Sequence, residues 1–157
     1  MLRGKLRLAG PFAVVATLAV ALAAGAPAVS GEPMSPEAVY KDIEATFGAV
    51  PTFIKQLPKA ALAGAWQEEK DLELSDKTAL TPKVKALISL AVAAQIPCDY
   101  CIYTDTLTAR GLGASDEEIK EAVAIAALTR HSSTILHGLQ VDMATYRKDA
   151  DRLAQQK

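Results

Sequence analysis

The segment from Val84 to Ile96 constrains the fold more than any other part of this 157-residue chain. Thr81 and Pro82 precede it with a capping side chain and a proline at the first helical position, which predicts a helix. Nearly all of its residues are apolar, and a helix that is apolar on most sides is buried on most sides. One small domain does not readily cover such a helix, so we expect a homo-oligomer.

Helix signals also dominate the rest of the chain, and no segment has a convincing strand pattern. Two further segments begin with capping residues, at Ser35 and at Ser115. Residues 59–74 have a helical pattern as well. We expect a break or kink at residues 132–133 and a last helix that continues to about residue 153. The predicted fold class is all-α.

Residues 1–30 have the pattern of a secretory signal peptide. Basic residues lie within the first seven positions, an almost wholly apolar run extends from Leu8 to Ala24, and Ala28-Val29-Ser30 fits a small-x-small cleavage site. The apolar run is also about long enough for an uncleaved membrane anchor, which stays the alternative. We expect cleavage, export to the periplasm or the medium, and one mature domain at residues 31–157.

The mature domain is mildly acidic. The formal charge of the whole chain is −1, and loss of the three basic residues of the signal segment leaves about −4. With no basic run in the remainder, we expect no nucleic-acid partner. Export would place the domain in a compartment where disulfides persist.

Cys98 and Cys101 are the only two cysteines, and they precede a helical run over residues 102–112. A cysteine in the first turn of a helix meets unpaired N–H groups and the positive end of the helix dipole, which both favour the reactive thiolate. The two thiols can also close as a disulfide. Because that disulfide closes a very short loop, it should stabilise the fold little. The pair therefore predicts thiol redox chemistry.

Other uses of this cysteine spacing fit the sequence less well. A c-type haem needs a histidine where Ile102 stands, and a thioredoxin-like site needs a preceding strand. A zinc site would draw on His131 and His137, but the nearer of these lies thirty positions after Cys101 and there is no second cysteine pair. We expect neither a metal nor another cofactor.

Four segments in a fixed order resemble one known family: Thr81–Ile88, Leu90–Gln95, Cys98–Cys101 and Gly113–Ile119. Strongly over about residues 80–130 and loosely over 35–80, the chain resembles the carboxymuconolactone decarboxylase family. Within that family it is similar to the alkylhydroperoxidase D-like branch that carries the paired cysteines. The resemblance implies a multi-helix, all-α fold that usually assembles as trimers or hexamers. It also implies peroxide reduction or disulfide exchange at the cysteines.

The resemblance assigns a role to each cysteine but leaves two acid–base groups of the family unmatched. By position, Cys101 would attack the peroxide and Cys98 would resolve the product. The family's activating histidine is replaced by Asp105, and its relay glutamate falls on or beside Ala86. No carboxylate lies between Lys77 and Cys98.

Asp105 shares a helix face with Cys98 and Cys101. An ionised Asp105 would raise the pKa of Cys101, whereas a protonated Asp105 could donate a hydrogen bond to the sulfur or the peroxide. Which state holds depends on its burial. His131, at the expected helix break, is the candidate for a replacement acid–base group. His137 is expected to be a packing or surface residue.

We thus expect a thiol-dependent oxidoreductase, with peroxiredoxin-type peroxide reduction through Cys101 as the leading activity and disulfide exchange beside it. Its partners would be a peroxide or disulfide substrate and a separate reducing partner. One alternative is a lactone decarboxylase-like enzyme that does not use the thiols. Another is a non-catalytic, oligomeric binding protein on the same scaffold. The unmatched relay groups favour this last alternative, and the retained cysteines oppose it.

Overall fold

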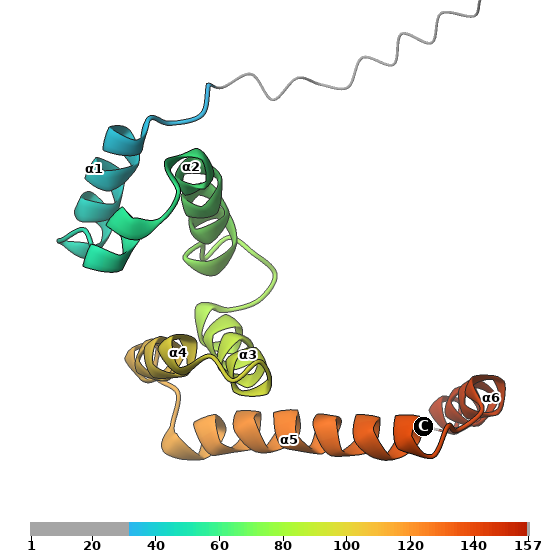
Figure 1. Cartoon of the computed structure of the whole chain (residues 1–157). Helices are drawn as coiled ribbons and strands as arrows, with labels where there is room; N and C mark the ends of the chain where they lie inside the picture. Colours follow the sequence, from blue (N-terminus) through green and yellow to red (C-terminus); the bar gives the residue numbers. More distant parts are fainter. Residues whose placement is uncertain (1–31, 157) are drawn as a thin grey trace, which may run out of the picture. The chain divides into compact units, whose positions relative to one another are not determined.

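Residues 32–156, the part of the chain that this computed structural model describes, contain six α-helices and no strand (Figure 1). The predicted all-α class is therefore confirmed. No helix in this part is both long and apolar enough to cross a membrane. The predicted signal peptide, residues 1–30, lies outside the described residues, so export and cleavage stay predictions.

Helices α1 (Pro36–Phe47) and α2 (Lys59–Glu68) pack against each other. Ser35 caps α1 by accepting a hydrogen bond from the N–H of Ala38, as its place before Pro36 predicts. A short 3-10 segment, η1 (Thr52–Gln56), lies between the two helices. The pair buries a common apolar cluster of Val39, Ile43, Leu62 and Trp66.

A single turn of π-helix, η2 (Glu69–Glu73), extends α2. The predicted helical pattern over residues 59–74 is confirmed, but its last turn is wider than an α-helix. Lys85 fixes the loop that follows, because its buried Nζ donates hydrogen bonds to two backbone carbonyls and one hydroxyl. The loop after η2 is therefore held against the helix that carries Lys85.

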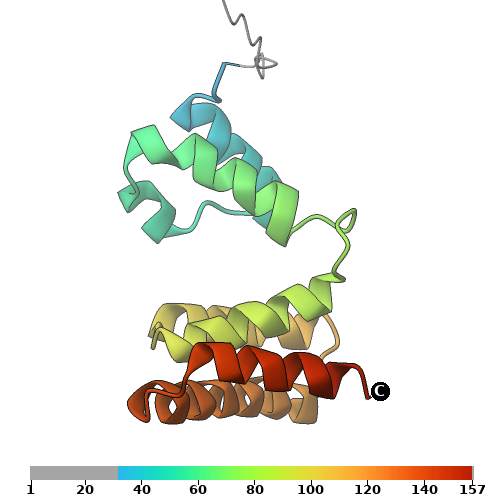
Figure 2. The same cartoon turned by 90° about the vertical axis from the view of Figure 1, so that its right-hand side faces the viewer.

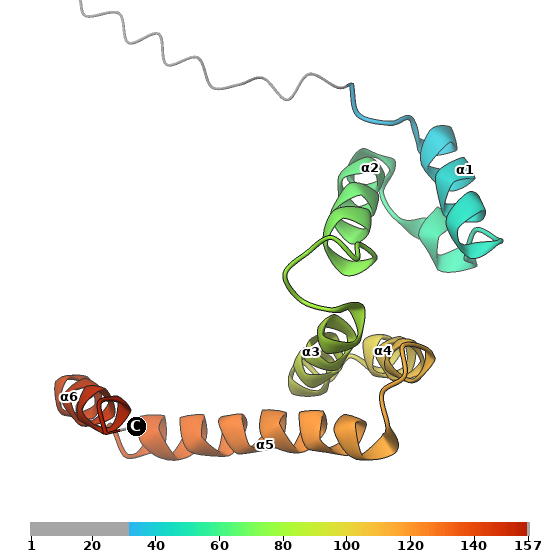
Figure 3. The same ribbon diagram turned by 180° about the vertical axis from the view of Figure 1, so that it is seen from behind.

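Helix α3 (Pro82–Gln95) packs against both α4 (Asp99–Gly111) and α5 (Asp116–Gly138). Figures 1 and 3 show α3 and α4 side by side along the N-terminal half of α5. The predicted caps are present, since Thr81 caps α3 and Ser115 forms a capping box with Glu118. The contact centres on three small buried side chains, those of Ala86, Ala109 and Ala114.

Helix α5 is continuous through residues 132–133, so the predicted break there is wrong. Serine lowers helix propensity only slightly, and two serines do not interrupt a long helix. The chain turns instead after Gly138, and α6 (Met143–Ala154) follows as a separate helix. Within residues 32–156, α6 packs against no other helix. It overlaps other helices in the view of Figure 2, but Figures 1 and 3 show it beyond the C-terminal end of α5.

Burial of α3 is one-sided. Its buried residues are Lys85, Ala86, Leu90 and Ala93. The opposite row remains between 38% and 62% exposed and consists of Val84, Ile88, Val92 and Ile96. The single chain therefore buries only one side of this helix, and burial of its other side in an oligomer stays a prediction. We call this row the open α3 face, because residues four apart lie on one side of a helix.

Candidate functional site

Cys98 and Cys101 lie at the N-terminal end of α4, as the sequence predicts. Cys98 is the N-cap, and its Sγ accepts a hydrogen bond from the N–H of Cys101 at 3.3 Å. A disulfide joins the two residues, whose Cα atoms are 5.3 Å apart. The structure therefore shows the oxidised pair. Both sulfurs lie where helix N–H groups and the helix dipole stabilise a thiolate after reduction.

The chain that leads into the cysteines is anchored to α5. The N–H of Cys98 donates to the carbonyl of Ala93 at 3.1 Å. The side chain of Gln95 donates to the carbonyl of Ala126 at 2.6 Å and accepts from Nε of Arg130 at 2.7 Å. These bonds hold the end of α3 on α5 and so fix the point at which α4 begins.

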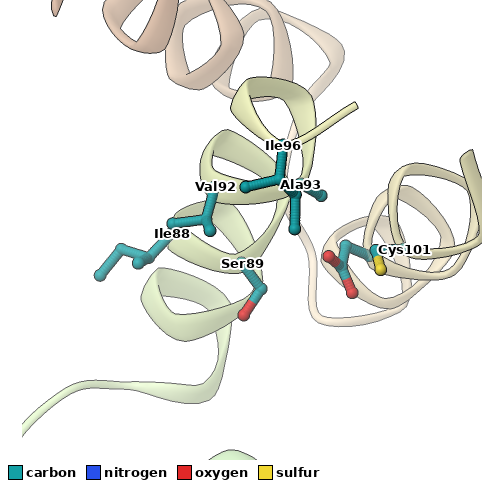
Figure 4. A pocket seen from close by; sticks show the side chains of 7 residues that line it. Ile88, Ser89, Val92, Ala93, Ile96 and Cys101 are labelled. Atoms are coloured by element: carbon teal, nitrogen blue, oxygen red, sulfur yellow. The ribbon is translucent and has the colours of Figure 1, made fainter. Parts of the chain in front are cut away.

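A cavity of about 260 Å³ lies between α3 and α4, beside the disulfide. Figure 4 shows Ser89 and Ala93 on α3 and Cys101 on α4 around it. Among the described residues, its lining consists of Ile88, Ser89, Val92, Ala93, Ile96, Cys101 and Asp105. The wall is mostly apolar, with one hydroxyl, one sulfur and one carboxyl group. Cys101, and not Cys98, therefore meets a space in which a small molecule can reach its sulfur.

Asp105 lies one turn after Cys101 and lines the same cavity, which confirms the predicted shared face. Partial burial raises the pKa of its carboxyl group, and the negative charge of Glu73 raises that pKa further. Asp105 therefore keeps its proton to a higher pH than an ordinary aspartate. Of the two states that the sequence leaves open, the shift is toward the neutral, hydrogen-bond-donating one.

Glu73 and Ser89 are neighbours of the site that the sequence does not single out. Ser89 lines the cavity, and its Oγ donates a hydrogen bond to Oε1 of Glu73 at 3.4 Å. Glu69 belongs to the same group, because burial raises its pKa and the charges of Glu73 and Asp105 raise it further. The i, i+4 spacing of Glu69 and Glu73 predicts a shared helix face. Nothing in that spacing shows that the face turns toward α3.

The position expected for the family's relay glutamate is buried in the contact between helices. Ala86 is 1% exposed and lies in the contact that also buries Ala109 and Ala114. A carboxylate buried among these alanines would be strongly unfavourable unless it found a hydrogen-bonding or cationic partner. The unmatched glutamate is therefore consistent with the packing of this chain.

The two histidines lie away from the cavity. His131 is exposed within α5 rather than at a break, and His137 is exposed in the last turn of the same helix. Neither is among the described residues that line the cavity. A role for His131 as an acid–base group therefore stays a prediction from the sequence. In residues 32–156, no group of three or more histidine, cysteine or acidic side chains is arranged to hold a metal ion.

The chain is similar to known proteins in sequence and in fold. The model of the carboxymuconolactone decarboxylase family matches residues 60–142, which is more than half of the chain and includes both cysteines. The crystal structure of the alkylhydroperoxidase AhpD core from Rhodospirillum rubrum has a TM-score of 0.61 and 28% sequence identity. That match covers 68% of this chain and 81% of the other. A search of curated proteins gives no match.

Proposed function

Because the chain belongs to the carboxymuconolactone decarboxylase family, we propose that its cysteine pair makes it a thiol-dependent oxidoreductase that reduces hydroperoxides. The observation that carries this proposal is the position of Cys101, which lines the cavity and is bonded to Cys98. The similar structure from Rhodospirillum rubrum is an alkylhydroperoxidase core, which supports the same reaction class here.

The oxidative half-reaction uses one hydroperoxide and both thiols. The Cys101 thiolate attacks the distal oxygen of the hydroperoxide, so that an S–O bond forms, the O–O bond breaks and an alkoxide leaves. The alkoxide takes up a proton equivalent to the one that the thiol released, and the Asp105 carboxyl group, in its protonated form, is placed to donate it. The Cys98 thiol then attacks the sulfenic sulfur of Cys101, an S–S bond forms and water leaves.

The reductive half-reaction returns the disulfide to two thiols and uses an external dithiol. A thiolate of this partner attacks Cys101, and Cys98 leaves as a thiolate that the N–H of Cys101 stabilises. The second thiol of the partner then attacks the mixed disulfide and releases Cys101. Entry of a disulfide substrate in place of a hydroperoxide gives disulfide exchange by the same steps. We also propose export, from the signal pattern of residues 1–30, so the dithiol partner would act outside the cytoplasm.

Thiol counting tests the proposed function. The chain has only two cysteines, so one equivalent of cumene hydroperoxide is expected to consume both thiols of the reduced protein and to form the intramolecular disulfide. A chromogenic thiol reagent and the intact mass follow the two changes. Retention of both thiols in excess hydroperoxide would overturn the proposal and favour a binding protein on this scaffold.

We further propose that a second copy of the chain covers the open α3 face. Ile88, Val92 and Ile96 belong both to this face and to the cavity wall, so a subunit contact there would enclose the site. α6 exposes apolar side chains too and packs against no other described helix. Monomeric soluble proteins rarely leave contiguous apolar surface of this kind, and homo-oligomer interfaces are rich in it. A trimer or hexamer, as the resemblance implies, is the expected assembly.

Val84→Glu tests the assembly without changing the cavity. Val84 belongs to the open α3 face but does not line the cavity. Burial of an unpaired carboxylate in a subunit contact costs several kcal/mol, so we expect Val84→Glu to shift the protein to smaller species at micromolar concentration. Light scattering during size exclusion gives the mass, and Thr46→Glu, at an exposed position of α1, is the control. A natural protein that is already monomeric would contradict this proposal.

A further inference from the structure

Three acidic side chains from two elements lie close together beside the cavity. Glu69 and Glu73 come from η2, and Asp105 comes from α4. Besides burial, the charge of Glu73 raises the pKa of Asp105, and the charges of Glu73 and Asp105 raise the pKa of Glu69. A like charge at short range disfavours the ionised form of a carboxyl group, so Glu69 and Asp105 retain a proton more readily than isolated carboxylates do.

Ser89 links this acidic group to the cavity. Its hydroxyl group lines the same cavity as Cys101 and Asp105, and it donates to Oε1 of Glu73 at 3.4 Å. A hydroxyl group both donates and accepts hydrogen bonds, so it can pass a proton between two neighbours. The hydrogen bond from Ser89 therefore links the Glu73 carboxylate to the cavity that Cys101 lines.

Lys85 holds this arrangement but does not neutralise it. Its Nζ donates to the carbonyl of Leu72 at 2.6 Å, to the carbonyl of Ser75 at 2.5 Å and to Oγ1 of Thr78 at 2.9 Å. An ammonium group has three donors, and all three are used by these oxygens. None of the ion pairs within residues 32–156 involves Glu73. Lys85 thus holds the backbone on both sides of Glu73, and the Glu73 carboxylate accepts a hydrogen bond from Ser89 without an ion-pair partner among the described residues.

We propose that Glu73, linked through the Ser89 hydroxyl group to the cavity that Asp105 and Cys101 share, holds the proton exchanged during hydroperoxide reduction. This inference rests on the proposed function. The proton of the Cys101 thiol passes through the Ser89 hydroxyl group to the Glu73 carboxylate as the thiolate forms. It returns to the alkoxide, or to Asp105 where that group has donated to the alkoxide, as the O–O bond breaks, so every carboxyl group ends in the protonation state in which it began. Glu73 thereby supplies the relay carboxyl group that the family resemblance places at or beside Ala86, where this chain has none.

Glu73→Gln tests the relay, because it removes the ionisable group and keeps the size and the acceptor for Ser89. We expect the oxidation of Cys101 by cumene hydroperoxide at neutral pH to slow by about tenfold to a hundredfold, at the low end of general acid–base effects. Stopped-flow measurement across pH should also show a changed profile. The charged groups on the elements packed around Glu73 are Glu69 in η2, Lys85 in α3 and Asp105 in α4.

Two comparisons separate a relay from a structural role. Alkylation of Cys101 by iodoacetamide at high pH uses the thiolate and no proton donor, so Glu73→Gln should leave it unchanged. Glu68→Gln removes one charge from an exposed neighbouring position and should keep the natural peroxide rate within about twofold. If Glu73→Gln does not fold, Ser89→Ala removes the linking hydroxyl group and is expected to slow the peroxide step by severalfold.

The outcomes distinguish this inference from the function on which it rests. A natural protein whose thiols do not react with hydroperoxide would overturn both. An active natural protein with unchanged rates in Glu73→Gln and Ser89→Ala would overturn the relay alone. Equal slowing of the peroxide reaction and of alkylation would assign Glu73 a structural role and would also overturn the relay.

Discussion

Replacing Cys101 with serine is expected to abolish hydroperoxide reduction, with a loss in rate of about a thousandfold or more. Serine is close to cysteine in size, but its hydroxyl group is not a nucleophile at neutral pH unless a strong base activates it. Cys98 remains in this variant, yet it caps α4 and is not among the described residues that line the cavity. Consumption of cumene hydroperoxide with dithiothreitol as reductant measures the effect.

Cys98→Ser is the matched control for this change. This variant keeps the Cys101 sulfur, which lines the cavity, and removes the Cys98 sulfur, which would form the disulfide with oxidised Cys101. Without added thiol, the variant is expected to consume one equivalent of hydroperoxide and to stop at the sulfenic acid of Cys101. The reverse pattern, with first attack retained in Cys101→Ser and lost in Cys98→Ser, would assign the attack to Cys98.

Replacing Asp105 with histidine is expected to speed hydroperoxide reduction by about tenfold to a hundredfold. Burial and the charge of Glu73 raise the pKa of Asp105, and once this carboxyl group ionises its charge opposes the Cys101 thiolate. An imidazole accepts the thiol proton near neutral pH, and its cation favours the thiolate and can then donate the proton to the alkoxide in place of Asp105. The pH dependence of Cys101 alkylation should therefore show a lower pKa of Cys101 in the variant.

Tyr103→His controls for the introduced ring. Tyr103 is 70% exposed and lies two residues before Asp105, so it points to the other side of α4. This control is expected to change neither the pKa of Cys101 nor the peroxide rate. Disulfide exchange should respond less than peroxide reduction to Asp105→His, because it depends mainly on the cysteine pair and the helix end. Loss of activity in Asp105→His alone would show that the aspartate itself is required.

The features that the sequence predicts correctly depend on local physical chemistry. Thr81 and Ser115 cap helices through hydrogen bonds to backbone groups only three residues away, so their role is visible in the sequence. Cys101 and Asp105 share a cavity because i and i+4 positions of any α-helix lie on one side. The position of the cysteines at the beginning of α4 is local too, because Cys98 caps this helix through a hydrogen bond from the N–H of Cys101.

The features that the sequence does not predict depend on which segments meet. Glu73 reaches the site through the packing of η2 on α3, across a loop that Lys85 holds. The periodicity of a helix shows which residues share a face but not what covers that face. For this reason the apolar pattern from Val84 to Ile96 predicts burial correctly for one side of α3 only, and the other side stays open in the single chain.

Trapping of a sulfenic acid is the most direct test of attack by the Cys101 sulfur. The reduced Cys98→Ser variant is treated with one equivalent of cumene hydroperoxide in the presence of dimedone, and the modified peptide is identified by mass spectrometry. We predict a dimedone adduct on Cys101 and stoichiometric loss of the hydroperoxide. An unmodified Cys101 thiol together with unconsumed hydroperoxide would contradict the proposed function.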